Sequence, residues 1–224
     1  MSASPAAACP AAPPVVRPEA PVARANAPQI VVGVPLPGKT SCADEGVETE
    51  PDPKSIEAIE PDRAVPPFAV TTIDCRRVDS RDLVGKTPFV LVFFASWCHV
   101  CERKMPLIHA AAAALGSEVP FIGVSVDENE TWGNVSGFVS RHGLSFPLVR
   151  GARFKDFALA YNPVGGVPVV VVVGKDGVLV DMQVGYTPFD YNRLVGAVRI
   201  AKEPESHDPS MPERVSQNPT RVLP

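Results

Sequence analysis

Residues 89–106 read FVLVFFASWCHVCERKMP, and this stretch decides the fold. Its first part, residues 89–95, is apolar and rich in β-branched and aromatic side chains, which is typical of a short, fully buried strand. Residues 109–115, HAAAAAL, follow a few positions later and favour helix strongly. The stretch therefore predicts a buried strand that leads directly into a helix.

Two cysteines, Cys98 and Cys101, stand at the junction of this strand and this helix. The unpaired amides of a first helical turn point toward the sulfur of Cys98, and their partial positive charge favours thiolate over thiol. Cys101 lies about one helical turn further on. It is therefore close enough to attack a mixed disulfide at Cys98, and the spacing predicts a dithiol/disulfide exchange site.

The composition separates a globular middle from two unusual ends. Hydrophobic residues make up 45% of the 224 residues, which is enough for a core, whereas the 26 prolines are concentrated toward the ends. We expect a Pro/Ala-rich and then acidic disordered segment over 1–64, one domain over 65–202 and a Pro-rich disordered tail over 203–224. The net charge of −4 and the lack of a Lys/Arg-rich run give no reason to expect a nucleic-acid partner.

The rest of the predicted domain has an α/β pattern. A small β-hairpin is expected around Asp74-Cys75, before the buried strand. Further strands are expected at 119–126, 146–149, 169–173 and 178–184, and further helices at 130–142, 154–161 and 191–202. This order predicts a central mixed β-sheet with helices on both faces and an N-terminal hairpin extension.

These features resemble the thioredoxin superfamily and, more narrowly, the bacterial TlpA/ResA-like thiol-disulfide oxidoreductases. The resemblance spans residues 66–202. The matching motifs, in the order of the family, are Leu83-Val84-Gly85-Lys86, FFASWCHVC at 93–101, Met105-Pro106, Phe146-Pro147, Gly166-Val167-Pro168, Lys175-Asp176-Gly177 and Gly185. The resemblance implies a thioredoxin-like fold and disulfide exchange with protein substrates. Reduction of the substrate is the expected direction, and oxidation is the alternative.

The resemblance assigns a role to each matching position. Cys98 resembles the nucleophile of the family, and Cys101 resembles its resolving cysteine. Gly166, Val167 and Pro168 resemble the loop in which a cis proline faces the disulfide and a substrate segment binds. Because proline has no N–H, the backbone groups before it stay free to pair with that segment.

Two neighbours of the first cysteine are predicted to tune its reaction. Trp97 resembles the family tryptophan that shields the site. An imidazolium at His99 would stabilise the Cys98 thiolate and make the disulfide more oxidising. The alternative for His99 is an exposed loop residue without a role.

Two positions depart from the pattern of the family. Val92 stands where many relatives carry an acid on the strand beneath the cysteines. Lys104 stands where the cytochrome-maturation branch often has glutamate. A carboxylate that would accept the proton of the resolving thiol is thus missing from both positions, and Lys104 would favour a thiolate at Cys101 by its charge instead.

Four other classes of protein are alternatives for the segment that contains Cys98, His99 and Cys101. A structural zinc site needs a second pair of ligands, which the sequence lacks. A copper metallochaperone-like protein would have three residues between its cysteines and a distal histidine, for which His142 is the candidate. A peroxidase would have Pro-x-x-x-Thr-x-x-Cys before Cys98, which is absent. A redox-inert interaction protein of the same fold does not need an intact cysteine pair.

We therefore expect no metal and no cofactor besides the redox-active Cys98–Cys101 disulfide. The expected partners are protein thiols or disulfides and an upstream thiol protein that donates or accepts electrons. The resemblance also implies a periplasmic protein, with or without a membrane or lipid anchor, and roles in cytochrome c biogenesis or antioxidant defence. No secretory signal or transmembrane segment is visible, so a cytoplasmic location stays open, as does the pairing of Cys9, Cys42 and Cys75.

Overall fold

The computed structural model describes residues 59–60 and 63–203. The disorder predicted for the two ends and the pairing of Cys9 and Cys42 fall outside these residues. Of the described helices, none is both long and apolar enough to cross a membrane.

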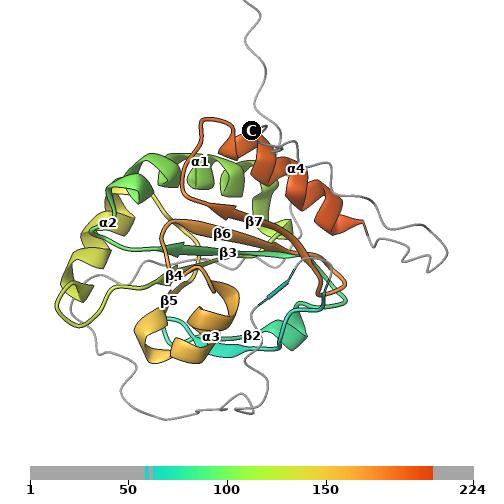
Figure 1. Ribbon diagram of the computed structural model, residues 1–224, viewed down its shortest axis with the longest axis horizontal. Coiled ribbons are helices and arrows are strands. Elements are labelled where there is room, and N and C mark those ends of the chain that lie inside the picture. Colours follow the sequence, from blue (N-terminus) through green and yellow to red (C-terminus); the bar gives the residue numbers. More distant parts are fainter. Residues whose placement is uncertain (1–58, 61–62, 204–224) are drawn as a thin grey trace, which may run out of the picture.

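A five-stranded mixed sheet forms the centre of the molecule (Figure 1). The strands are β3 (Phe89–Phe94), β4 (Phe121–Ser125), β5 (Leu148–Arg150), β6 (Val169–Val173) and β7 (Leu179–Val184). Their order across the sheet is β5-β4-β3-β6-β7. The first three run parallel, whereas β6 is antiparallel to both of its neighbours. The predicted mixed sheet is confirmed.

Helices cover both faces of this sheet, as predicted. The helices are α1 (His99–Leu115), α2 (Val135–His142), α3 (Lys155–Tyr161) and α4 (Asp190–Lys202), and short 3-10 helices occur at Ser80–Asp82, Gly116–Glu118, Trp132–Asn134 and Gly151–Arg153. In Figure 1, α1 and α4 lie together on one side of the sheet, and α3 lies on the other side beside the hairpin. That hairpin consists of β1 (Ala69–Thr71) and β2 (Arg77–Asp79), which pair antiparallel.

The central strand β3 is buried along its whole length because each of its faces meets a different core. Its even-numbered residues pack under α1, α2 and α4, in one cluster with Cys98 and Cys101. Its odd-numbered residues pack with α3 and the hairpin. Period-two alternation between two apolar cores explains why the strand reads as a continuous apolar run. It also places Val92 in the same core as the two cysteines.

Several boundaries differ from those expected. The helix predicted over 130–142 is α-helical only from Val135, and a 3-10 turn over Trp132–Asn134 precedes it, as is frequent at the start of an α-helix. The strand predicted at 146–149 begins at Leu148 because Pro147 has no N–H to donate to a ladder. The carbonyl of Pro147 still accepts a hydrogen bond from Gly123, so the chain already runs beside β4 there.

Candidate active site

The two cysteines are joined in a disulfide at the start of α1. Their Cα atoms lie 5.2 Å apart. Cys98 is the N-cap residue of the helix, and its sulfur accepts a hydrogen bond from the backbone N–H of Cys101 at 3.1 Å. This is the contact between sulfur and first-turn amide that the sequence predicts. Through this hydrogen bond, the sulfur of Cys98 lies at the positive end of the helix dipole.

The surroundings of the disulfide are asymmetric. Cys98 is 7% exposed, whereas Cys101 is fully buried. Trp97, immediately before Cys98, is 55% exposed, and His99, immediately after it, is also exposed as the first residue of α1. A reactant from solvent therefore meets Cys98 rather than Cys101, with Trp97 beside it.

The loop before β6 lies against Cys98. The Val167–Pro168 peptide bond is cis, and the carbonyl oxygen of Val167 lies 3.5 Å from the sulfur of Cys98. Pro168 is buried, and the carbonyl of Gly166 accepts a hydrogen bond from the Asn162 side chain at 2.9 Å. The structure thus brings Val167, whose chain neighbours are Gly166 and Pro168, to the predicted cysteine pair from a distant part of the chain.

A buried carboxylate holds the turn that precedes the cysteines. Asp127 is fully buried, and its carboxylate accepts hydrogen bonds from the backbone N–H of Ser96 at 2.8 Å and from the Ser96 hydroxyl at 2.5 Å. The hydroxyl of Ser125 donates a third bond at 2.8 Å. Because Ser96 lies two residues before Cys98, this carboxylate positions the chain that enters the disulfide.

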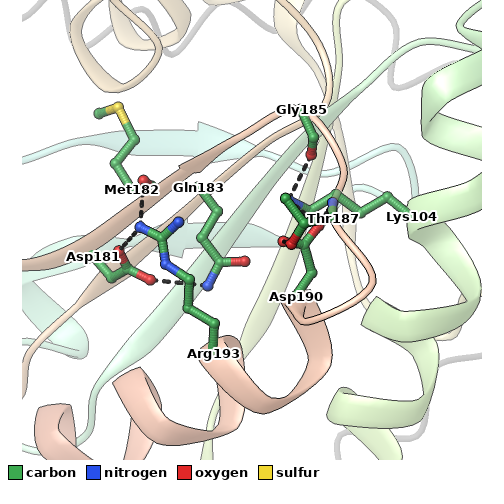
Figure 2. Close-up of polar contacts among 8 residues, drawn as sticks. All are labelled: Lys104, Asp181, Met182, Gln183, Gly185, Thr187, Asp190 and Arg193. Atoms are coloured by element: carbon green, nitrogen blue, oxygen red, sulfur yellow. Dashed lines mark hydrogen bonds and ion pairs between the residues drawn. The ribbon is translucent and has the colours of Figure 1, made fainter. Parts of the chain in front are cut away.

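A buried ion pair joins α1, the helix that begins beside the disulfide, to the start of α4 (Figure 2). Lys104 is fully buried on α1, and its ammonium lies 3.1 Å from the carboxylate of Asp190, which is 3% exposed at the start of α4. The ammonium also donates a hydrogen bond of 2.8 Å to the carbonyl of Gly185. Thr187 donates from both its N–H and its hydroxyl to the same carboxylate, at 2.9 and 2.7 Å.

The electrostatics of this pair follow from its burial and its bonds. Burial lowers the pKa of Lys104, and the interaction with Asp190 opposes that shift. Burial alone would raise the pKa of Asp190, but hydrogen bonds from Thr187 and Lys104 outweigh it and lower that pKa. The carboxylate is therefore ionised at neutral pH and balances the charge of the lysine.

The residues that the copper-binding alternative needs are not brought together. His142 ends α2 and packs against the ring of Phe138, with centroids 4.6 Å apart. Within residues 59–60 and 63–203, no group of three or more His, Cys, Asp or Glu side chains is arranged to hold a metal ion. Glu102, next to Cys101 in the chain, is exposed, and its carboxylate lies 3.5 Å from Arg141.

Sequence reasoning missed both buried carboxylates. Asp127 had a usable signal, since β3 and β4 are parallel neighbours and the register pairs Phe94 with Ser125. Ser96 and Asp127 each follow that pair by two residues, so they meet at one edge of the sheet. Asp190 had only a weak signal. Thr187 and Asp190 have the spacing of a helix start, but nothing local shows that Lys104 lies opposite.

Replacing Asp127 tests its positioning role. Asp127→Ala leaves the N–H of Ser96 without its acceptor, so we expect a loss of about 2 kcal/mol in unfolding free energy and about tenfold in kcat. Asp127→Asn is the matched control. Its carbonyl oxygen still accepts from Ser96 N–H and Ser125, and its amide donates to the Ser96 hydroxyl. Urea unfolding and insulin reduction measure both effects, and equal losses in the two variants would contradict the role.

The fold and the bonded cysteine pair define the class of this protein, a thioredoxin-like protein with a redox-active Cys-x-x-Cys. The AhpC/TSA family matches residues 61–182, more than half of the chain. The chain therefore belongs to the AhpC/TSA family of thioredoxin-like proteins.

Known relatives agree with this assignment. The chain is 30% identical over 128 residues to the thiol-disulfide oxidoreductase ResA of Bacillus thuringiensis, which covers 55% of this chain and 69% of that protein. It is 32% identical over 113 residues to the ResA of Geobacillus thermodenitrificans, covering 50% of this chain and 62% of the relative. The similarity to these relatives, together with the bonded cysteine pair, shows that the chain is a thiol-disulfide oxidoreductase.

Solved structures agree on the fold. The thioredoxin domain of a thiol-disulfide oxidoreductase from Bacteroides vulgatus matches with a TM-score of 0.52 at 17% identity, covering 63% of this chain and 99% of that one. A thiol:disulfide interchange protein of the thioredoxin family from Chlorobium tepidum matches with a TM-score of 0.50 at 23% identity, covering 62% and 97%. At these identities the likeness concerns the fold alone.

Proposed function

We propose that this protein reduces disulfide bonds in other proteins, with Cys98 as the nucleophile and Cys101 as the resolving cysteine. The observation that carries the proposal is the asymmetry of the pair. Cys98 is the cysteine with exposed surface, and its sulfur receives the first-turn amide of α1. Cys101 is fully buried, so we assign it the second step, the attack on a mixed disulfide that has already formed at Cys98.

In the proposed reaction, the Cys98 thiolate attacks one sulfur of a substrate disulfide. The substrate S–S bond breaks, and the first substrate sulfur leaves as a thiolate that takes up a proton. Cys101 loses its proton and attacks the sulfur of Cys98, which releases the second substrate sulfur as a thiolate. Two electrons have then passed from the cysteine pair to the substrate, and an upstream thiol protein reduces the pair again without any cofactor.

The neighbouring residues have proposed roles in this cycle. The backbone of Gly166 and Val167 and the ring of Pro168 form the edge against which an extended substrate segment lies. The exposed ring of Trp97 covers the apolar part of that segment. The imidazole of His99, in its protonated form, stabilises the thiolate at the start of α1.

Insulin reduction in the presence of dithiothreitol tests this function. The wild-type protein is expected to accelerate the precipitation of insulin chains well above the rate with dithiothreitol alone, and no acceleration would refute the proposal. A redox titration of the cysteine pair tests the direction. A midpoint near that of thioredoxin, about −270 mV, supports reduction, whereas one near that of DsbA, about −120 mV, indicates disulfide formation instead.

We also propose an extracytoplasmic location, with cytochrome c biogenesis and antioxidant defence as the processes to examine first. The support is the resemblance to TlpA/ResA-like proteins and the ResA relatives. Cell fractionation with an antibody against the domain tests the location, and recovery in the cytoplasmic fraction alone would contradict it.

A further inference from the structure

A closed ring of contacts joins α1 to the loop that faces the disulfide. The sulfur of Cys98 lies 3.5 Å from the carbonyl oxygen of Val167. The next carbonyl, that of Pro168, accepts a hydrogen bond from the N–H of Gly185 at 2.8 Å. The carbonyl of Gly185 accepts one from the ammonium of Lys104 at 2.8 Å. Lys104 is on the same helix as Cys98, so the ring closes.

Packing alone does not explain why a charged side chain occupies position 104, because an apolar side chain of similar size would fill the same space. A buried ion pair is weak support for stability, because well-packed apolar residues of similar volume often replace such a pair without loss. Lys104 is nevertheless fully buried with its charge directed at Asp190 and Gly185. Figure 2 shows its side chain reaching from α1 to the segment between β7 and α4. The lysine thus ties the helix that begins at the cysteines to that segment.

Two other charged side chains nearby, Arg193 and Asp181, bind each other, whereas Arg103 lies over the ring of Tyr186 at 5.0 Å from its centroid. The guanidinium of Arg193 on α4 donates to the carboxylate of Asp181 on β7 at 2.5 Å and to the carbonyl of Met182 at 3.2 Å. The Gln183 amide donates to the other oxygen of Asp181 at 2.9 Å. The carboxylate of Asp190 thus pairs with Lys104 and accepts hydrogen bonds from Thr187, and the carbonyl of Gly185 accepts a hydrogen bond from Lys104, as Figure 2 shows.

We propose that Lys104 is a positioning residue for substrate binding. By holding Gly185, it keeps the Val167–Pro168 loop at its distance from Cys98. The inference rests on the proposed function, because the loop matters only if a substrate segment binds along it. It adds a residue outside the loop that determines how well the segment binds.

Loss of the lysine opens the ring at one place. The Gly185 segment then loses its hydrogen bond to α1 and keeps the weaker contact between Arg103 and the ring of Tyr186. The loop therefore samples positions in which a substrate segment does not fit between Pro168 and Cys98. A substrate segment binds only while the loop is in the position described here. Its apparent affinity therefore falls in proportion to the fraction of time that the loop spends in that position. The chemistry at Cys98 with a small disulfide needs no loop and is therefore unaffected.

The test compares two variants of the full chain. Asp190→Asn keeps the lysine and its bond to Gly185, so the KM for insulin is expected to stay within about twofold of wild type. Lys104→Met combined with Asp190→Asn removes the bond without leaving a buried charge, and the KM is expected to rise about tenfold, the effect of one lost charged hydrogen bond. The rate at which glutathione disulfide oxidises the reduced pair should be the same in both variants. Lys202→Met, which breaks an ion pair with Glu118 at the far end of α4, controls for lysine removal.

A second readout follows the ring itself. The amide of Gly185, bonded to Pro168, should exchange with solvent about tenfold faster in the double variant than in Asp190→Asn. If both the KM and this exchange rate equal those of Asp190→Asn, the inference is wrong. If wild type does not reduce insulin at all, the proposed function fails, and the exchange rate still tests the ring.

A further variant covers the case in which the double variant does not fold. Lys104→Gln with Asp190→Asn places two neutral amides opposite each other. The glutamine is one atom shorter than lysine, which withdraws its donor from Gly185. The same rise in KM and in Gly185 exchange is expected, and wild-type values for both would overturn the inference.

Discussion

Cys98→Ser is expected to lower insulin reduction by at least about a thousandfold, to the rate of dithiothreitol alone. Serine is close to cysteine in size and keeps the N-cap of α1, since its hydroxyl oxygen accepts from the N–H of Cys101 as the sulfur does. The fold is therefore retained while the nucleophilic sulfur is lost. The rate of insulin precipitation, with circular dichroism as a check on folding, measures this effect.

A second cysteine provides the matched control for this prediction. Cys9 lies far from the pair in the sequence, and Cys9→Ser is expected to reduce insulin at the wild-type rate. Residual activity of Cys98→Ser above one tenth of wild type would contradict the assignment of the nucleophile. A loss in Cys9→Ser as large as that in Cys98→Ser would do the same.

Lys104→Met is expected to destabilise the fold strongly, with a loss of about 3 kcal/mol in unfolding free energy. Removing the ammonium leaves the carboxylate of Asp190 buried without its ionic partner, although Thr187 still donates to it. Urea unfolding of the oxidised protein measures the effect as a lower midpoint at unchanged slope.

Two further variants show whether the loss comes from the unpaired charge. Asp190→Asn added to Lys104→Met removes the buried charge and should restore at least about half of the lost free energy. Lys202→Met breaks an exposed pair with Glu118 and should cost less than about 1 kcal/mol. Equal losses for Lys104→Met and Lys202→Met would show that the buried pair contributes no more than a surface pair.

The part of the site that sequence predicted well is the part built from one continuous segment. The apolar run, the cysteine spacing and the helix-forming residues predict β3, the disulfide and α1 because each depends on neighbours within a few positions. The place of Val167 and Pro168 beside Cys98 came from the family resemblance. No property of those residues alone specifies contact with a helix so far away in the sequence.

The buried charged residues that support the site could not be predicted from their neighbours in the sequence. Lys104 stood out only as a departure from the family pattern, and its partner Asp190 lies on α4, far from α1 in the sequence. Asp127 was closer to prediction, because parallel pairing of β3 with β4 brings the ends of both strands together. In both cases the burial of a charge depends on its tertiary partners rather than on its own neighbours in the chain.

Trapping of the mixed disulfide tests the central claim most directly. Cys101→Ser removes the resolving thiol, so a substrate attacked by Cys98 should stay covalently attached. After incubation of the reduced variant with insulin, mass spectrometry of the non-reduced digest should find insulin peptide linked to the peptide that contains Cys98. No adduct, or insulin attached to peptides of the other cysteines and not to the peptide that contains Cys98, would contradict thiol-disulfide exchange at Cys98.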